Sequence, residues 1–244
     1  MNKFQHLQTE LSSQLLSTKE RFNELNNKNN LKVNFEEEYN FFYHLVTSSF
    51  YNINGIATCT FSSLKEAFLN IAKYGLSINP KLNLCYIRTE QSCAQANVNI
   101  AVYDFGYKGL LKLITRTGKV KIVTADVFYE NDNFEFRGTR EPVKHSTKTL
   151  SAAARGAMAG GYCSSELVAG GVVTTIMTPE ELREIESICQ STGNEAWNSV
   201  FIDELRRKTL IKRHWKTLMQ VIEEQNLSVP IEETYQCDFA NGGY

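Results

Sequence analysis

This sequence has almost no net charge, because its 26 lysines and arginines are balanced by 27 aspartates and glutamates over 244 residues. The protein therefore has no overall positive electrostatic field that would attract nucleic acid. Any such binding has to come from local patches of positive charge. No apolar run approaches the roughly 18 residues that indicate a membrane span, and the N-terminus lacks the apolar core of a signal peptide. These absences predict a cytoplasmic protein with no membrane partner.

Paired cysteine motifs are also missing. The six cysteines form no C-x-x-C pair, and the four histidines are scattered singly. This pattern argues against a zinc site and is typical of reduced thiols in a reducing compartment. We therefore expect neither a metal nor a cofactor.

What remains is the composition of an ordinary globular protein, with 42% hydrophobic and 22% charged residues. The length allows one large domain or two small ones. Apolar residues three or four apart predict helices, and alternating ones predict strands. The expected helices cover residues 2–28, 35–50, 64–74, 178–190 and 195–224, and the expected strands cover residues 84–90, 97–104, 120–129, 133–137, 153–163 and 171–177.

Several helix ends carry their own sequence signals. A capping box at 63–66 predicts the start of one helix, and Gly75 predicts its end. The run 178–181, Thr-Pro-Glu-Glu, predicts another start. Gly118 stands where a short helix that begins after Gly106 needs a left-handed residue.

The segment 103–121 is the most distinctive part of the sequence, with five basic residues and one acid, Asp104. Lys108, Lys112 and Arg116 recur every four residues, so they form one stripe along the short helix. A helix with one apolar side and one cationic side suits a polyanion such as nucleic acid. The opposite, apolar side is expected to contain Tyr107, Leu110, Leu111 and Ile114.

Further residues around this helix are candidates for the same site. Lys119 and Lys121 extend the positive charge past the helix end. Tyr103, Phe105 and Tyr107 can stack on bases, although aromatic residues beside a strand end more commonly belong to a core.

A second cationic segment occupies residues 205–216 and carries six basic residues. At 100° per residue most of them fall on one broad side, but Arg207 falls in the middle of the apolar side. A buried guanidinium needs an anionic partner, either a carboxylate of the protein or the phosphate of a ligand bound in a cleft. We favour the cleft. The cations of the broad side are Arg206, Lys208, Lys212, Arg213 and Lys216.

Other interpretations of these charges remain open. A cationic stripe is most often a solvated face, although such faces usually mix signs and residues 105–121 contain no acid. The basic faces can also be subunit contacts of a structural oligomer that binds no DNA. A metal-dependent nuclease would need clustered carboxylates, for which Asp126, Glu130 and Asp132 are candidates.

Short motifs along the chain occur in a characteristic order. They are Gly-Leu-x-Ile-Asn-Pro at 75–80, Gly-Tyr-Lys-Gly at 106–109, Arg-Thr-Gly at 116–118, Phe-Tyr-Glu-Asn-Asp-x-Phe at 128–134, His145, Met-Thr-Pro-Glu-Glu at 177–181, Trp197 and Arg-Lys-Thr-x-Ile-Lys at 207–212. Over about residues 60–218 they resemble the RecT family of phage single-strand annealing proteins. The resemblance departs at Asp104, where a neutral residue is expected, and in a hairpin loop that is longer than usual.

The resemblance implies an α+β fold, in which a small, bent antiparallel sheet with a β-hairpin is flanked by helices as in Rad52-type annealing proteins. It implies a protein of a bacterial host cell that binds single-stranded DNA and pairs complementary strands in homologous recombination, without ATP and without catalysis. Implied partners are the annealed duplex, further copies in a ring or helical filament, a 5′→3′ exonuclease and a host single-strand-binding protein.

Residue roles follow from the same resemblance. It assigns DNA contacts to Lys108, Lys112 and Arg116 in the first segment, and to Arg207, Lys208 and Lys212 in the second. Charge and position add Lys119, Lys216 and Tyr107. The expected organisation is an N-terminal helical region at 1–60 that packs between subunits, an annealing core at 61–222 and a flexible acidic tail at 223–244.

Overall fold

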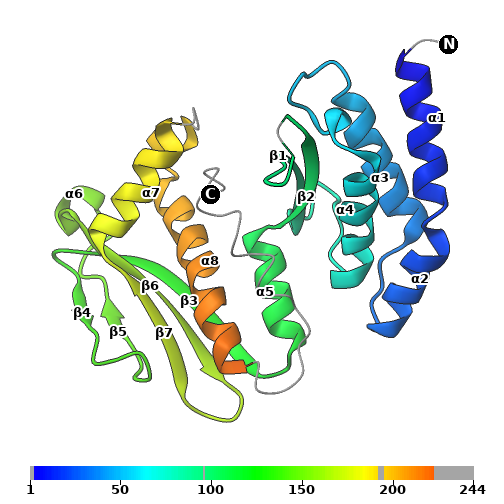
Figure 1. The fold of residues 1–244 in the computed structure, drawn as a ribbon. Coiled ribbons are helices and arrows are strands. Elements are labelled where there is room, and N and C mark those ends of the chain that lie inside the picture. Colours follow the sequence, from blue (N-terminus) through cyan, green and yellow to red (C-terminus); the bar gives the residue numbers. More distant parts are fainter. Residues whose placement is uncertain (1–2, 96, 192–194, 223–244) are drawn as a thin grey trace. The chain divides into compact units, whose positions relative to one another are not determined.

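The computed structural model of the chain describes residues 3–95, 97–191 and 195–222 (Figure 1). The chain forms two compact units, Met1–Gly109 and Leu110–Tyr244. Residues 61–109 therefore belong to the same unit as the N-terminal helices, whereas the sequence interpretation placed them with the annealing core. The predicted tail at 223–244 lies outside the described residues.

Four α-helices make up most of the first unit. The single helix expected at 2–28 is wrong, because the chain forms α1 (Lys3–Leu16) and α2 (Lys19–Lys28). Between them the Thr18 hydroxyl donates to the Leu15 carbonyl at 2.6 Å. A hydroxyl that bonds the backbone in this way competes with helix continuation. The other two are α3 (Phe35–Ser48) and α4 (Phe61–Tyr74).

The core of this unit is built around aromatic rings. Phe68 of α4 lies with its ring centroid 5.2 Å from those of Phe22 and Phe42, and 5.6 Å from that of Phe35. Such edge and tilted arrangements add to the burial energy of each ring. They join α2, α3 and α4 into one hydrophobic cluster.

Both ends of α4 are defined by local chemistry. Thr60 is the residue that caps its N-terminus, since the Thr60 hydroxyl accepts from the Ser63 backbone N–H at 3.3 Å. The helix thus begins three residues before the predicted start at 64. Gly75 ends it with φ of +60°, as predicted, in a conformation that favours glycine.

The predicted β-hairpin is confirmed. Strands β1 (Cys85–Gln91) and β2 (Asn99–Phe105) pair antiparallel, with Ile87 opposite Tyr103. One face of the hairpin packs on α4. Helix α5 (Tyr107–Arg116) follows β2 directly, and Gly118 after it has φ of +65°, as predicted.

The second unit is organised on a three-stranded antiparallel sheet of order β3-β6-β7 (Figure 1). Strand β3 (Val120–Tyr129) has the predicted bounds, and β7 (Val172–Met177) begins one residue late. Strand β6 (Met158–Leu167) begins five residues later than predicted, because the short helix α6 (Ala152–Arg155) occupies its expected start. A second small sheet pairs β4 (Asn133–Glu135) with β5 (Lys144–Ser146).

Two further helices belong to the second unit. Helix α7 (Pro179–Ser191) begins with the predicted capping box, in which the Glu181 N–H donates to the Thr178 hydroxyl and the Thr178 N–H donates to Glu181 Oε2. Helix α8 (Ile202–Ile222) begins later than the helix expected at 195–224, because a 3₁₀ turn (Glu195–Asn198) precedes it, and residues 223–224 lie outside the described residues.

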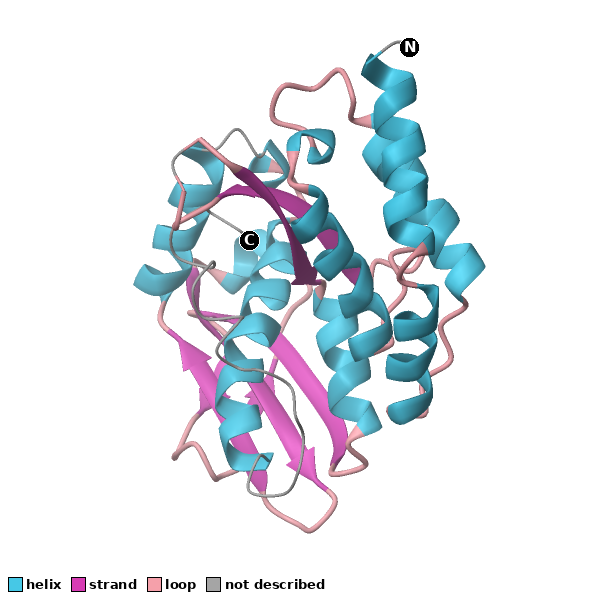
Figure 2. Cartoon of the chain, turned by 45° about the vertical axis from the view of Figure 1, so that its right-hand side comes forward, coloured by secondary structure: helices cyan, strands magenta, loops and turns pink. Residues whose placement is uncertain are grey.

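Helix α8 lies across one face of the three-stranded sheet (Figure 2). Gly161 of β6 leaves room for it, because a Cβ there would stand 2.6 Å from Leu210. His214 of α8 contacts hydroxyls of β6 and β7. The chain is thus an α+β protein with small antiparallel sheets flanked by helices, as predicted. Within the described residues, no helix combines the length and the hydropathy needed to cross a membrane.

Candidate nucleic-acid interface

The start of α5 is pressed against the loop that precedes β1. The Gly106 N–H donates to the Leu84 carbonyl at 2.9 Å. A Cβ at Gly106 would stand 2.7 Å from the Asn83 carbonyl oxygen, and one at Gly109 would collide with the Leu84 carbonyl. Close approach between two backbones is one reason for glycine at such positions. The Gly-Tyr-Lys-Gly motif therefore fixes where the cationic helix begins.

The predicted cationic stripe lies on the exposed side of α5. Lys108, Lys112 and Arg116 are all exposed. Leu110 and Ile114, from the predicted apolar side, are buried, whereas Leu111 is half-buried. Leu113 is buried as well, although the predicted apolar side did not contain it. The helix therefore has the two-sided character that the sequence indicated.

The aromatic residues near α5 divide between core and surface. Phe105 is buried, and the Tyr103 hydroxyl donates to the Leu76 carbonyl while its ring stacks on Tyr74 at 5.6 Å. Both rings therefore belong to the core of the first unit. Tyr107 is half-buried, and its predicted role in stacking stays a prediction.

Tyr86 is an exposed aromatic residue that the sequence interpretation missed. It lies on the outer face of the hairpin, opposite Asp104, and is 45% exposed. Alternation along β1 was the signal available, since Cys85 and Ile87 on either side of Tyr86 are buried.

The unexpected acid before Gly106 is paired with a base. Arg88 Nε lies 3.1 Å from Asp104 Oδ2, and Arg88 Nη2 lies 3.1 Å from Glu90 Oε1. Glu90 is buried and Asp104 is half-buried. The guanidinium thus bridges both carboxylates across the outer face of the hairpin and offsets the charge of Asp104.

On α8 the two adjacent arginines have exchanged their predicted positions. Arg206, expected on the cationic side, is buried, and its Nε lies 2.6 Å from Glu186 Oε1 of α7. Its Nη1 lies 2.8 Å from Asp203 Oδ1. The prediction for Arg206 is wrong because a carboxylate on a neighbouring helix holds this side chain in the interior, which a helical projection of α8 alone cannot show.

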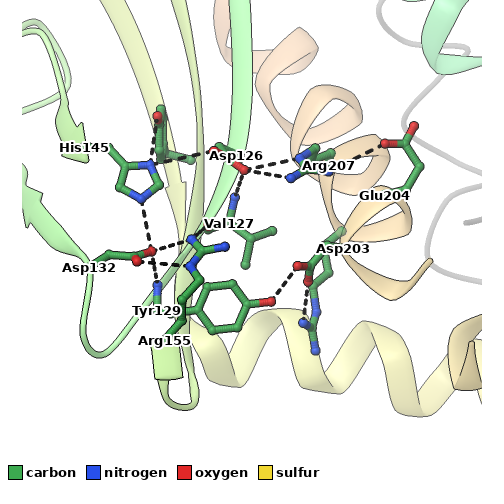
Figure 3. A network of polar contacts seen from close by, with 11 residues as sticks. Asp126, Val127, Tyr129, Asp132, His145, Arg155, Asp203, Glu204 and Arg207 are labelled. Atoms are coloured by element: carbon green, nitrogen blue, oxygen red, sulfur yellow. Dashed lines mark hydrogen bonds and ion pairs between the residues drawn. The ribbon is translucent and has the colours of Figure 1, made fainter. Parts of the chain in front are cut away.

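Arg207 pairs with a carboxylate, whereas the sequence analysis favoured a cleft that binds phosphate. Its Nη2 lies 3.0 Å from Asp126 Oδ1 of β3, and its Nη1 lies 3.8 Å from Glu204 Oε2 (Figure 3). The Arg207 side chain is 39% exposed. An exposed pair of this kind is weak, so the guanidinium remains accessible to a phosphate. A DNA contact by Arg207 stays a prediction.

The other cations of α8 lie at or near the surface. Lys208, Lys212 and Lys216 are half-buried, and exposed Arg213 lies 3.3 Å from Glu181 Oε1. Their contacts with DNA stay predictions.

Lys119 connects the turn after α5 with the end of α8. Its ammonium donates to the Ile222 carbonyl at 3.4 Å. A cation at the C-terminus of a helix is favourable, because the last carbonyls carry the negative end of the helix dipole. Lys119 is half-buried, and part of its charge therefore serves this contact rather than solvent.

A polar network ties the sheet of the second unit to its short connections (Figure 3). Asp132 accepts from both Nε and Nη2 of Arg155, and its Oδ2 lies 3.2 Å from His145 Nε2. These bonds, Arg155 first, lower the pKa of Asp132 to about 2. The guanidinium of Arg155 also lies 4.2 Å from the centroid of the Tyr129 ring. The motif residues Tyr129, Asp132 and His145 therefore have a structural role in the second unit.

The three carboxylates that a metal-dependent nuclease would need are instead bound to arginines or to a backbone N–H. Asp126 pairs with Arg207, and Asp132 pairs with Arg155. Glu130 accepts from the backbone N–H of Ala157 at 3.1 Å. Within the described residues no group of three or more His, Cys, Asp or Glu side chains is arranged to hold a metal ion.

Comparison with known proteins places most of the chain in one family. The model of the RecT family matches residues 45–236. Protein RecT of Escherichia coli (strain K12) is 24% identical over 186 residues, which cover 74% of this chain and 66% of that protein. The match thus spans slightly less than two thirds of the length of that relative.

Proposed function

This chain belongs to the RecT family, and from that premise we propose that it binds single-stranded DNA and pairs complementary strands in homologous recombination. The proposal assigns it no catalytic step and no ATP. The observation that carries it is the stripe of Lys108, Lys112 and Arg116, which are exposed on one side of a helix whose other side is buried. The stripe lies within the residues that match the family.

The mechanism is electrostatic. Lysines and arginines that neutralise phosphates release counterions, so affinity for DNA falls steeply with salt. Because the net charge of the chain is −1, binding depends on such local patches. A strand held by its backbone leaves its base edges free for a second strand. Correct pairing then contributes about 1.4 kcal/mol per base-pair step, the mean for DNA stacking.

Repeated copies make the reaction selective. Subunits side by side, in a ring or filament, join their cationic stripes into one long site, so that a long match outcompetes a short one. Lys119 and the cations of α8, Arg207, Lys208, Lys212 and Lys216, extend the surface along which the strand runs. A 5′→3′ exonuclease would supply the single strands that such a protein pairs.

The test compares Lys112→Ala with Lys32→Ala. Both lysines are exposed, but Lys32 lies outside the residues that match the family. Binding of a labelled single-stranded oligonucleotide is measured over a series of salt concentrations. Lys112→Ala should lower affinity for every sequence and reduce the slope of log affinity against log salt by about 0.7, the value per phosphate for single strands. Lys32→Ala should change neither.

Annealing itself is measured with two complementary oligonucleotides in the absence of ATP. The wild-type protein should accelerate duplex formation, and Lys112→Ala should do so less at the same protein concentration. An unchanged affinity for Lys112→Ala at physiological salt would remove α5 from the site. A wild-type protein without salt-sensitive binding would support the structural oligomer instead.

A further inference from the structure

Tyr86 is held in place by the backbone that begins the cationic helix. A Cβ at Gly106 would stand 3.0 Å from Cε2 of the Tyr86 ring. The Tyr86 hydroxyl donates to Asn83 Oδ1 at 3.4 Å. One edge of the ring is therefore fixed against the chain, while 45% of the residue faces solvent.

Each of the two segments that contact Tyr86, the loop before β1 and the turn at Gly106, carries a lysine nearby in the chain. Lys81 lies in the loop before β1. The carbonyl oxygen of Asn83, in the same loop, is the atom that a Cβ at Gly106 would approach most closely. Lys108 follows Gly106 by two residues. Both are exposed, and within the described part of the chain neither ammonium is in an ion pair.

The nearby acids do not cancel the charge of the two lysines. Asp104 stands opposite Tyr86 in the hairpin register, but Arg88 Nε lies 3.1 Å from its carboxylate. Arg88 also contacts Glu90, so these three charges sum to −1, and the two lysines together bring the local sum to +1. An exposed aromatic ring whose neighbouring segments carry lysines is suited to a nucleotide, because a base offers a flat face and its phosphate a negative charge.

We propose that Tyr86, with Lys81 and Lys108, forms a subsite for one unpaired nucleotide, whose base stacks on the tyrosine ring and whose phosphate lies near the lysines. The inference rests on the proposed function and adds a base contact to a site otherwise described by phosphate contacts. Stacking tolerates any base, so the subsite holds a strand without reading its sequence. Because the ring contacts the face of the base, the pairing edge stays free for a complementary strand.

A role in structure alone is the alternative explanation for Tyr86. Its ring packs on Gly106, and such packing stabilises the start of α5 with or without DNA. The two roles differ in their dependence on the base. Only stacking makes the effect of a Tyr86 substitution depend on whether the oligonucleotide carries bases.

The experiment therefore compares a labelled single-stranded oligonucleotide with one of equal length built from abasic residues. Wild type, Tyr86→Leu, Tyr86→Phe and the control Tyr51→Leu are titrated against both by fluorescence anisotropy. Tyr51 is a matched control because it is 85% exposed and lies away from α5 in sequence. Thermal unfolding of each variant establishes that it is folded.

Tyr86→Leu should bind the normal oligonucleotide about tenfold more weakly than wild type, as expected for the loss of one base–aromatic stack. Its affinity for the abasic oligonucleotide should equal that of wild type. Tyr86→Phe, which keeps the ring, and Tyr51→Leu should both behave as wild type.

Equal weakening of both oligonucleotides by Tyr86→Leu, or no weakening of either, would overturn the subsite while wild-type binding still upholds the proposed function. Failure of the wild-type protein to bind either oligonucleotide would overturn the proposed function, and the subsite with it. The two failures are therefore distinguishable in one set of titrations.

Discussion

Gly109 of α5 and Leu84, the residue before β1, approach so closely that no side chain fits between them. A Cβ at Gly109 would stand 3.0 Å from the carbonyl carbon of Leu84 and closer still to its oxygen, and 3.1 Å from Cδ1 of Leu76. Because the nearest obstacle is backbone, it cannot be relieved by a change of rotamer. The contact fixes the first residues of α5, up to Gly109, against the loop before β1.

Gly109→Ala should therefore destabilise the protein. Helix propensity alone would make the substitution favourable by about 1 kcal/mol. Overpacking against a backbone typically costs about 1–3 kcal/mol, and the clash should prevail. Urea denaturation measures the free energy of unfolding. Gly118→Asn is the control, because the space around Gly118 is open and asparagine tolerates its positive φ. A Gly109→Ala protein as stable as wild type would mean that α5 can shift without loss.

The neighbouring arginines of α8 should lose very different amounts of stability when each is replaced by methionine. Arg206→Met leaves the buried carboxylate of Glu186 without its partner, which typically costs about 3–5 kcal/mol. Arg207→Met removes an exposed pair with Asp126 and should cost less than about 1 kcal/mol. Urea denaturation of both variants checks the difference. Similar losses for the two would show that burial does not distinguish them.

The sequence predicted elements whose signals are local. The hairpin follows from alternation, the bounds of β3 from a run of β-branched and aromatic residues, and the start of α7 from its capping box at 178–181. The two faces of α5 follow from a period of four in an unbroken helix. In each case the residues that decide the structure are neighbours in the chain.

The failures concern partners that lie far away in sequence. Arg206 is buried because Glu186, twenty residues earlier, accepts from it. Arg207 is turned to the sheet edge by Asp126 of β3. The angle of each residue around α8 follows from the sequence, but which angle faces a carboxylate depends on the packing of α7 and β3. Tyr86 is a different case, because alternation along β1 was available and places Tyr86 on the face opposite buried Cys85 and Ile87.

Asp132→Asn should be strongly destabilising. The Asp132 side chain is 1% exposed and pairs with Arg155 and His145. An amide accepts fewer bonds than the carboxylate and leaves the cationic guanidinium of Arg155 without its counter-ion, which typically costs about 3 kcal/mol. Thermal unfolding measures the loss. Glu135→Gln is the control, because Glu135 pairs with Arg137 and Lys144 at the surface and its loss should leave stability unchanged. Equal stability of the two variants would contradict a structural role for the network.

His214 should make the stability of the protein depend on pH. The residue is 1% exposed, with Nε2 2.7 Å from the Ser165 hydroxyl and Nδ1 2.9 Å from the Thr175 hydroxyl. Burial lowers the pKa of His214 to about 4, whereas an unfolded histidine has a pKa of about 6.5. Between these values the unfolded chain binds a proton that the folded protein does not. Stability is therefore unaffected above about pH 6.5 and falls as the pH is lowered toward 4.

The expected fall for the His214 contribution is about 3 kcal/mol between pH 7 and pH 4, since one pKa unit corresponds to about 1.36 kcal/mol. His214→Gln, which offers a donor and an acceptor but does not titrate, should lose less over this interval. Asp132 does not confuse the comparison. The stability contributed by its lowered pKa, about 2, is present above about pH 4 and is lost only below it. Urea denaturation of wild type and variant at several pH values measures the difference, and parallel curves would mean that His214 accepts its proton without cost.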